Sequence, residues 1–148
     1  MGYVENIRKK IGHDAIFMPA ATCAIIKNKK ILLQRRSDDN TWALHGGALE
    51  LGEDFLDAVL REVKEELSID IIKPKFIKVY SGSKMYHKYP NGDIVYSILA
   101  LFLVNDYVGE IKIDNKEVLD VKWFSLDTIP DNIIETDKIL INDIKEYL

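Results

Sequence analysis

The sequence has very little cysteine, since Cys23 is the only one among its 148 residues. A lone cysteine cannot form a disulfide within the chain, and no Cys/His cluster suggests zinc. Cys23 lies inside the apolar run 17–26, so we expect a small buried side chain. These absences exclude a disulfide-stabilised scaffold and a structural zinc site.

Excess basic charge is also missing, because 24 Asp and Glu outnumber 20 Lys and Arg, for a net charge of −4. Proteins that bind duplex nucleic acid usually carry a basic patch, so we expect no such partner. The longest uncharged stretches, 15–26 and 94–104, are too short to span a bilayer. Residues 1–10 lack the apolar core of a signal peptide. We therefore expect a cytoplasmic protein that does not enter a membrane.

No linker, repeat or low-complexity tract divides the chain. Its 47% apolar and 30% charged residues are ordinary for a globular protein. A chain of this length can bury a full core. Residues 1–148 are therefore predicted to form one domain.

Apolar periodicity predicts strands and two helices. Branched apolar runs predict strands over 20–26, 30–35, 42–47, 69–81, 94–104 and 118–124. The first two are joined by a turn at 27–29, and 89–93 also has clear turn chemistry. Apolar residues three and four apart predict helices over 54–67 and 135–147. Because strands neighbour strands, the order favours an α+β fold with a mixed sheet over regular βαβ winding.

The helix predicted over 54–67 has an acidic face opposite its apolar stripe. Asp54 is a plausible N-cap. At 100° per residue, Glu62, Glu65 and Glu66 fall within an arc of roughly 100°, and Arg61 projects elsewhere. Neighbouring like charges destabilise a helix by a few tenths of a kcal/mol per pair, so either water or a cation must screen them. Carboxylate oxygens suit Mg²⁺ or Mn²⁺.

Glycines surround the loop that enters this helix. Gly46, Gly47 and Gly52 allow backbone to approach a ligand closely, and a helix entry offers free N–H groups to an anion. A metal bridging to a phosphate could therefore lie between the loop and the carboxylates.

At this point the sequence resembles the Nudix (MutT-like) hydrolase family. Its motif G-x5-E-x7-R-E-U-x-E-E-x-G-U, with U a bulky aliphatic, spans 23 residues here, and only one of its nine defined positions fails. The matching residues are Gly47, Glu53, Arg61, Glu62, Val63, Glu65, Glu66 and Ile69. The resemblance extends over about 20–130 and implies the Nudix fold, a mixed sheet sandwiched between helices.

Two positions depart from the family pattern. Ser68 replaces the glycine after the helix, where a left-handed C-cap would make serine cost about 1 kcal/mol. His45 replaces the proline that commonly precedes the glycine pair. It is either a tolerated loop substitution or a histidine near bound phosphate, which would titrate near neutral pH.

The resemblance implies metal-dependent hydrolysis of a phosphoanhydride. Glu62 and Glu66 would bind Mg²⁺ or Mn²⁺, with Glu65 close by and the Gly46 carbonyl as a further ligand. Glu62, Glu65 or Glu117 could deprotonate the attacking water, and the sequence does not choose among them.

Other residues would support or contact the substrate. Arg61 and Glu53 are expected to form an ion pair that orients the helix and its loop. Arg36 and Gly47 are candidates for phosphate contact. The loop 84–93 carries Tyr86 and Tyr89 for stacking on a base, together with lysines.

The implied substrate is a small nucleoside diphosphate linked to another moiety. ADP-ribose, a dinucleoside polyphosphate and a modified nucleoside triphosphate all stay open. A silent Nudix domain that senses a nucleotide is the alternative function, although such a domain should lose motif carboxylates. A Nudix-fold isomerase should show a dedicated cysteine and longer insertions. The terminal helix could pack on its own domain or help form a homodimer.

Overall fold

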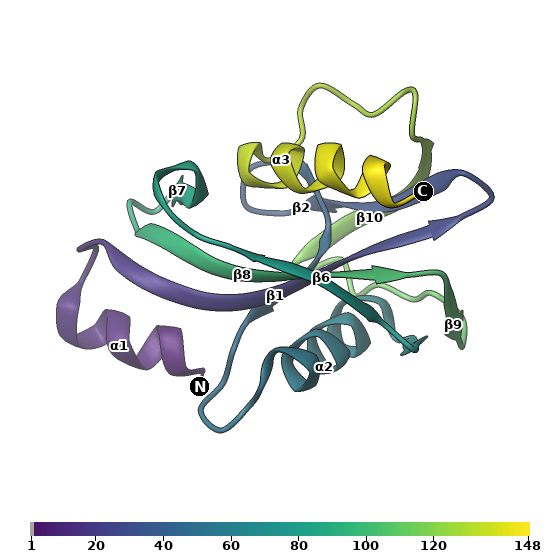
Figure 1. The fold of residues 1–148 in the computed structure, drawn as a ribbon. Coiled ribbons are helices and arrows are strands. Elements are labelled where there is room, and N and C mark those ends of the chain that lie inside the picture. Colours follow the sequence, from purple (N-terminus) through teal and green to yellow (C-terminus); the bar gives the residue numbers. More distant parts are fainter. Residues whose placement is uncertain (1) are drawn as a thin grey trace.

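A computed structural model describes residues 2–148 (Figure 1). Met1, the first residue of the expected amino-terminal segment 1–10, lies outside the described residues. The helices are α1 (Tyr3–Ile11), α2 (Phe55–Leu67) and α3 (Glu135–Ile144), with 3₁₀ turns η1 (Ser83–Met85) and η2 (Lys145–Tyr147). The strands are β1 (Ile16–Lys27), β2 (Lys30–Arg36), β3 (Trp42–Ala43), β4 (His45–Ala48), β5 (Asp70–Ile72), β6 (Lys75–Tyr80), β7 (Tyr86–Lys88), β8 (Ile94–Val104), β9 (Asp106–Val108) and β10 (Val118–Ser125).

The main sheet is mixed, and β1 is its central strand. The order is β10-β2-β1-β8-β6, with β1 and β8 parallel and the other pairs antiparallel. Residues 20–23, in the middle of β1, pair with β4, whereas only the last two residues of β1 pair with β2. The strands β4 and β2 therefore diverge on the same side of β1, and this divergence opens the sheet.

Each face of the sheet carries its own apolar core. Along β1, Ala21, Cys23 and Ile25 pack with the buried residues of α2, while Ala20 and Ala24 pack with those of α3. Helix α3 covers one face and α2 the other, as Figure 1 shows. The predicted α+β fold with a sheet between helices is confirmed. Cys23 is fully buried, as expected.

The single strand predicted over 69–81 is wrong. Residues 70–72 pair with β9 in a small second sheet, while 75–80 pair with β8 in the main sheet. Lys73 has a positive φ of 47°, and Pro74 has no N–H for a ladder. The turn at these two residues redirects the chain from one sheet to the other.

The strand predicted over 42–47 is likewise two strands. Trp42 and Ala43 pair with β2, and His45 to Ala48 pair with β1. The chain changes partner at Leu44, which belongs to neither ladder.

Helix α1 was not predicted from the sequence; it is as amphipathic as α2, but none of its residues is buried. Polar contacts hold it in place. Arg8 donates to the carbonyl oxygens of Gly12, Asp14 and Ile94, and the Tyr3 N–H donates to Glu50 Oε1 over 2.8 Å. No helix among residues 2–148 combines the length and apolarity needed to span a bilayer.

Helix α2 ends at Ser68 in the left-handed region, with φ 63° and ψ 24°. Its hydroxyl donates to the Lys112 carbonyl at 3.1 Å on the exposed surface. A residue other than glycine is strained in this region of the backbone. The expectation that Ser68 occupies a left-handed C-cap is therefore confirmed.

We predict that Ser68→Gly raises the free energy of unfolding by about 0.5–1 kcal/mol, because glycine removes the left-handed strain. Urea denaturation measures this change. Ser68→Ala is the matched control, since it removes the same hydroxyl but keeps the strain. Equal stability of the two variants would show that the C-cap conformation is not strained.

Candidate active site

A cleft of about 550 Å³ opens where β4 and β2 diverge from β1. Volumes of this order suit small organic ligands. One end is lined by the glycine loop, Glu66 and Glu117, and the other by residues of β7, β8 and the start of α3. Elements far apart in the sequence thus share one concave surface.

The strand change at Leu44 is stabilised by two side chains. The Leu44 N–H donates to Asp137 Oδ2 at 2.9 Å, and Gln34 Nε2 donates to the Leu44 carbonyl at 3.0 Å. Backbone groups without a ladder partner require such partners when they are buried. The crossing therefore places one carboxylate and one amide at the floor of the cleft.

Close backbone packing explains Gly46. A Cβ at this position would overlap the Ala21 carbonyl oxygen and the Thr22 Cα of the neighbouring strand. The Gly46 N–H points instead at Glu66 and donates to its Oε1 at 2.9 Å. Glycine is thus required for β4 to lie against β1 and still face α2.

Glu66 is a half-buried carboxylate on the cleft wall. Besides the Gly46 N–H, it accepts a hydrogen bond from Gln34 Nε2 to Oε2 at 3.1 Å. Burial raises the pKa of Glu66 well above its ordinary value, and the charges of Glu62 and Glu117 raise it further. Elevated carboxyl pKa values are typical of functional sites.

Glu62 stands one helical turn before Glu66 and faces Gly47. A Cβ on Gly47 would lie only 2.5 Å from the Glu62 carboxyl carbon, so the glycine leaves room for this carboxylate. Burial raises the pKa of Glu62 despite its contact with Arg61. The two carboxylates are therefore brought to the same loop, as the motif spacing predicted.

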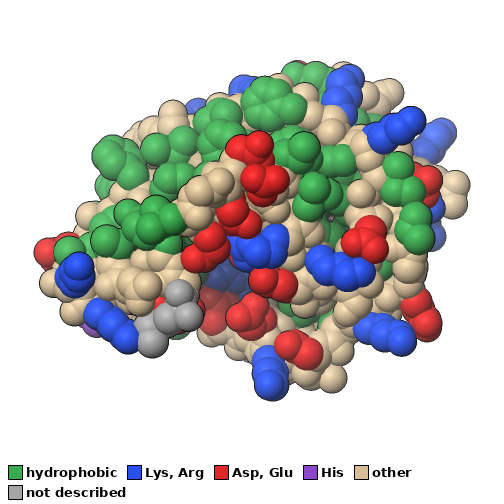
Figure 2. All heavy atoms as spheres, turned by 90° about the horizontal axis from the view of Figure 1, so that it is seen from below, with side chains coloured by type: hydrophobic (Ala, Val, Ile, Leu, Met, Phe, Trp, Pro, Cys, Tyr) green, Lys and Arg blue, Asp and Glu red, His purple; other side chains and the backbone are tan. Residues whose placement is uncertain are grey.

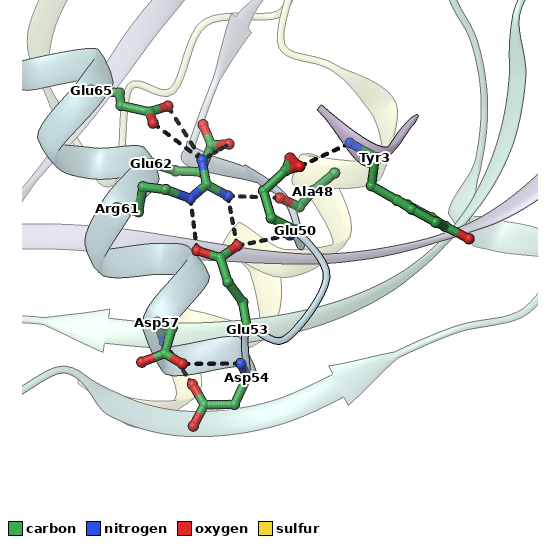
Figure 3. A network of polar contacts seen from close by, with 9 residues as sticks. All are labelled: Tyr3, Ala48, Glu50, Glu53, Asp54, Asp57, Arg61, Glu62 and Glu65. Atoms are coloured by element: carbon green, nitrogen blue, oxygen red, sulfur yellow. Dashed lines mark hydrogen bonds and ion pairs between the residues drawn. The ribbon is translucent and has the colours of Figure 1, made fainter. Parts of the chain in front are cut away.

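Arg61 lies at the centre of a polar network, shown in Figure 3. It makes a two-pronged ion pair with Glu53, at 2.7 Å and 2.8 Å, which confirms the predicted pair. Hydrogen bonding by Arg61 lowers the pKa of Glu53. Arg61 Nη2 also donates to the Ala48 carbonyl at 3.1 Å, so α2 is tied to the loop that precedes it.

The expectation that Arg61 projects away from the acidic cluster is wrong. Its Nη1 lies 2.9 Å from Glu62 Oε1 and 3.3 Å from Glu65. A helical projection follows Cα directions, whereas the long arginine side chain bends back across the helix surface. Figure 2, which views the molecule from the α2 side, shows acidic side chains in a band with basic side chains set among them.

The remaining acidic candidates occupy different positions. Glu65 has a 58% exposed side chain directed at Arg61 and does not line the cleft. Glu117 is exposed in the loop before β10 and does line it. Its charge contributes to the raised pKa values of Glu62 and Glu66. Glu117 therefore lies in the cleft near the carboxylate pair, whereas Glu65 lies near Glu62 but outside the cleft.

An aromatic and cationic wall forms another part of the cleft. Arg36 hydrogen-bonds Asp38 at 3.0 Å and 2.6 Å, and its guanidinium lies 5.7 Å from the Tyr89 ring centre. Tyr89 packs edge-on against His87 at 4.6 Å between ring centres. Of the two predicted tyrosines, Tyr89 lines the cleft, whereas Tyr86 is 43% exposed and packs on Tyr96 outside it. Sequence reasoning missed His87, although it lies in the predicted loop.

The hypothesis that His45 titrates beside a phosphate is corrected. The side chain is fully buried, and its Nε2 lies 2.9 Å from the Leu32 carbonyl. Burial lowers the pKa of His45 to about 4. His45 pairs with Cys23 in the sheet, and its side chain points into the core and not at the loop.

Asp137 was missed because a single aspartate at the start of a helix carries no spacing signal. It is 8% exposed, yet it lines the cleft, and burial raises its pKa to about 6. The Leu44 N–H and the positive charge of Arg36 oppose that increase.

The donor set of the glycine loop and α2 fits a divalent cation. Glu62 and Glu66 present hard oxygens beside a backbone that has no side chain to obstruct them. Among residues 2–148, no three acidic, histidine or cysteine side chains are already gathered as a metal site. The oxygens of Glu62 and Glu66 instead accept hydrogen bonds from Arg61, Gln34 and Gly46.

Comparison with known proteins decides the family. The sequence profile of the NUDIX domain matches residues 17–144. The chain belongs to the Nudix family. The motif residues and the cleft described above are therefore those of a Nudix domain.

Curated relatives include proteins named as hydrolases or pyrophosphatases. The chain is 32% identical over 120 residues to an NAD-capped RNA hydrolase NudC of Vibrio vulnificus, covering 80% of this chain and 42% of that protein. It thus spans about two fifths of the NudC relatives' length. It is 30% identical over 127 residues to an ADP-ribose pyrophosphatase of Methanocaldococcus jannaschii, covering 84% of this chain and 69% of that protein. An RNA pyrophosphohydrolase of Pelagibacter ubique is 29% identical, with 81% and 83% covered.

A solved structure confirms the fold. The MutT Nudix hydrolase of Burkholderia pseudomallei superposes with a TM-score of 0.74 at 23% identity, covering 87% of this chain and 98% of that one. At this identity, the likeness concerns the fold alone.

We predict that Asp137 makes folding pH-dependent. Its folded pKa, about 6, exceeds the ordinary 3.8, so its contribution favours the folded state at low pH and is lost as pH rises from about 4 to 6. Asp137→Asn keeps an oxygen for the Leu44 N–H and cannot ionise. The stability of this variant relative to wild type should increase by about 2 kcal/mol between pH 4 and pH 7.

Chemical denaturation across this pH range measures the difference. The exposed Asp131, which lies outside the cleft, provides the control variant Asp131→Asn. A stability difference for Asp137→Asn that does not change with pH would contradict the raised pKa.

Proposed function

We propose that this protein is a metal-dependent hydrolase that cleaves a pyrophosphate linkage in a nucleoside diphosphate joined to another moiety. The main support is the pair Glu62 and Glu66, both held against the glycine loop, with Glu66 lining the cleft. Relatives named for NAD-capped RNA, ADP-ribose and RNA pyrophosphate substrates share one linkage, a phosphoanhydride attached to a nucleoside. That shared chemistry supports the linkage and leaves the second moiety open.

In this proposal Glu62, Glu66 and the Gly46 carbonyl hold Mg²⁺ or Mn²⁺. The bound cation supplies charge neutralisation of the phosphates and a more acidic water. Arg61 orients Glu62 through the 2.9 Å contact and fixes the loop through Glu53. Because Glu65 turns to Arg61 and lies outside the cleft, it takes a supporting place at the edge of the site.

Glu117 is the proposed general base. Of the three glutamates considered for this role, Arg61 donates hydrogen bonds to Glu62 and Glu65, whereas Glu117 lines the cleft. A carboxylate there can accept the proton of the attacking water and release it to solvent.

The proposed substrate contacts come from other residues that line the cleft. Arg36 lies where it can contact a phosphate, with Gly47 offering close backbone approach on the other side. The rings of Tyr89 and His87 offer a surface for a base or sugar. The proposed substrate is a small nucleotide. We also predict that the protein binds no nucleic acid duplex, that it can form a homodimer and that it is cytoplasmic.

We predict that Glu66→Gln loses far more turnover than the roughly 10–100-fold expected for an outer-sphere partner, because it removes a cation ligand. Product release is measured for ADP-ribose, NAD, diadenosine polyphosphates, nucleotide sugars and normal and oxidised triphosphates, each with Mg²⁺, Mn²⁺ or chelator. The wild type should turn over at least one compound, and chelator should abolish this activity.

The control is Glu110→Gln, because Glu110 is exposed and lies outside the cleft. It should retain wild-type turnover and folding. Unchanged turnover in Glu66→Gln would contradict the proposal that Glu66 is a metal ligand. Binding of nucleotides without turnover of any would favour the sensing module over the hydrolase.

A further inference from the structure

Gln34 lies on β2 and contacts two parts of the site. These are Leu44, where the chain passes from β3 to β4, and Glu66 on α2. Its side chain is 5% exposed, and its Nε2 lies 3.0 Å from the Leu44 carbonyl oxygen and 3.1 Å from Glu66 Oε2. Neither comparison nor motif assigns a role to this position.

The orientation of the Gln34 amide is set by its neighbours. An amide has two hydrogens on nitrogen and none on oxygen. Both neighbours, the Leu44 carbonyl and the carboxylate of Glu66 in the ionised form that binds a cation, only accept hydrogen bonds. Turning the amide over would place Oε1 against two acceptors, so Nε2 must face Glu66.

The other end of the same amide has no partner. Oε1 of Gln34 is buried without a hydrogen bond among residues 2–148. A buried acceptor without a donor destabilises the folded state. Gln34 therefore stabilises the strand crossing through the Leu44 carbonyl, and its unpartnered amide oxygen offsets part of that gain.

The contact with Glu66 gives the same amide a second role. Gly46 N–H holds Oε1 of the carboxylate, and Gln34 holds Oε2, so both oxygens are fixed from the protein side. Each carboxylate oxygen has two lone pairs, and each of these contacts uses one. The free lone pairs are thereby left for a ligand in the cleft.

We propose that Gln34 is a positioning residue that orients the Glu66 carboxylate for the divalent cation, an inference that rests on the proposed function. Outer-sphere partners of this kind typically change metal affinity by 10–100-fold. Gln34 acts through Glu66 and does not itself touch the substrate's reacting atoms.

The test measures Mn²⁺ binding to the full chain by calorimetry, with thermal unfolding in parallel. Gln34→Met keeps the side-chain length and removes both polar ends. Its Mn²⁺ affinity should fall by about 10-fold. Its melting temperature should fall by about 5 °C, because the buried Leu44 carbonyl loses its donor while the unpartnered acceptor of Gln34 disappears. Raising Mn²⁺ should restore most of the turnover, which a general structural defect would not allow.

Thr22→Val is the matched control. It removes another buried hydrogen bond of the same cleft, from Thr22 Oγ1 to the His45 carbonyl at 3.0 Å, without a contact to Glu66. It should bind Mn²⁺ like the wild type. Gln34→Asn, whose shorter amide cannot span both acceptors, provides a second variant if Gln34→Met does not fold, and it should also lose affinity.

The outcomes separate the two proposals. If Glu66→Gln loses Mn²⁺ binding while the folded Gln34 variants keep wild-type affinity within twofold, the positioning role is overturned and the hydrolase stands. An equal loss of affinity in Thr22→Val would also overturn it. If Glu66→Gln binds Mn²⁺ like the wild type, Glu66 is not a cation ligand, and the proposed cation site is overturned together with the role of Gln34.

Discussion

The cleft depends on two hydrogen bonds to the backbone of Leu44. Because the chain passes there from pairing with β2 to pairing with β1, its peptide groups take partners from side chains. Asp137 of α3 accepts from the N–H, and Gln34 of β2 donates to the carbonyl. The same glutamine reaches α2 through Glu66. One irregular residue therefore joins both helical layers to the sheet.

A second set of contacts fixes the loop between β4 and α2. Arg61 binds Glu53 and the Ala48 carbonyl, and the Glu53 carboxylate accepts the Glu50 N–H at 2.8 Å. Glu50 in turn accepts the Tyr3 N–H, which links the loop to α1 (Figure 3). Because Arg61 also contacts Glu62, the position of that carboxylate depends on the conformation of the whole loop.

The sequence predicted the parts of the fold and site that repeat or obey fixed spacing. Apolar periodicity located α2, and the motif placed Glu62 and Glu66 beside Gly47. Features that depend on a single contact were not predictable in this way. Asp137 lies 93 residues from its partner Leu44, and His45 is buried because the short strand β4 joins the main sheet beside β1. The break at Lys73-Pro74 did have a sequence signal, since proline cannot donate within a ladder.

The position of Cys23 has a practical consequence for spectroscopy. The side chain is fully buried, and burial, followed by the nearby Glu66 charge, raises the pKa of its thiol. Thiol-directed dyes and spin labels react with accessible thiolates, so this cysteine offers them almost nothing at neutral pH. Since the chain has no other cysteine, one introduced on the surface would be the only labelled site, and the unmodified chain would serve as the background.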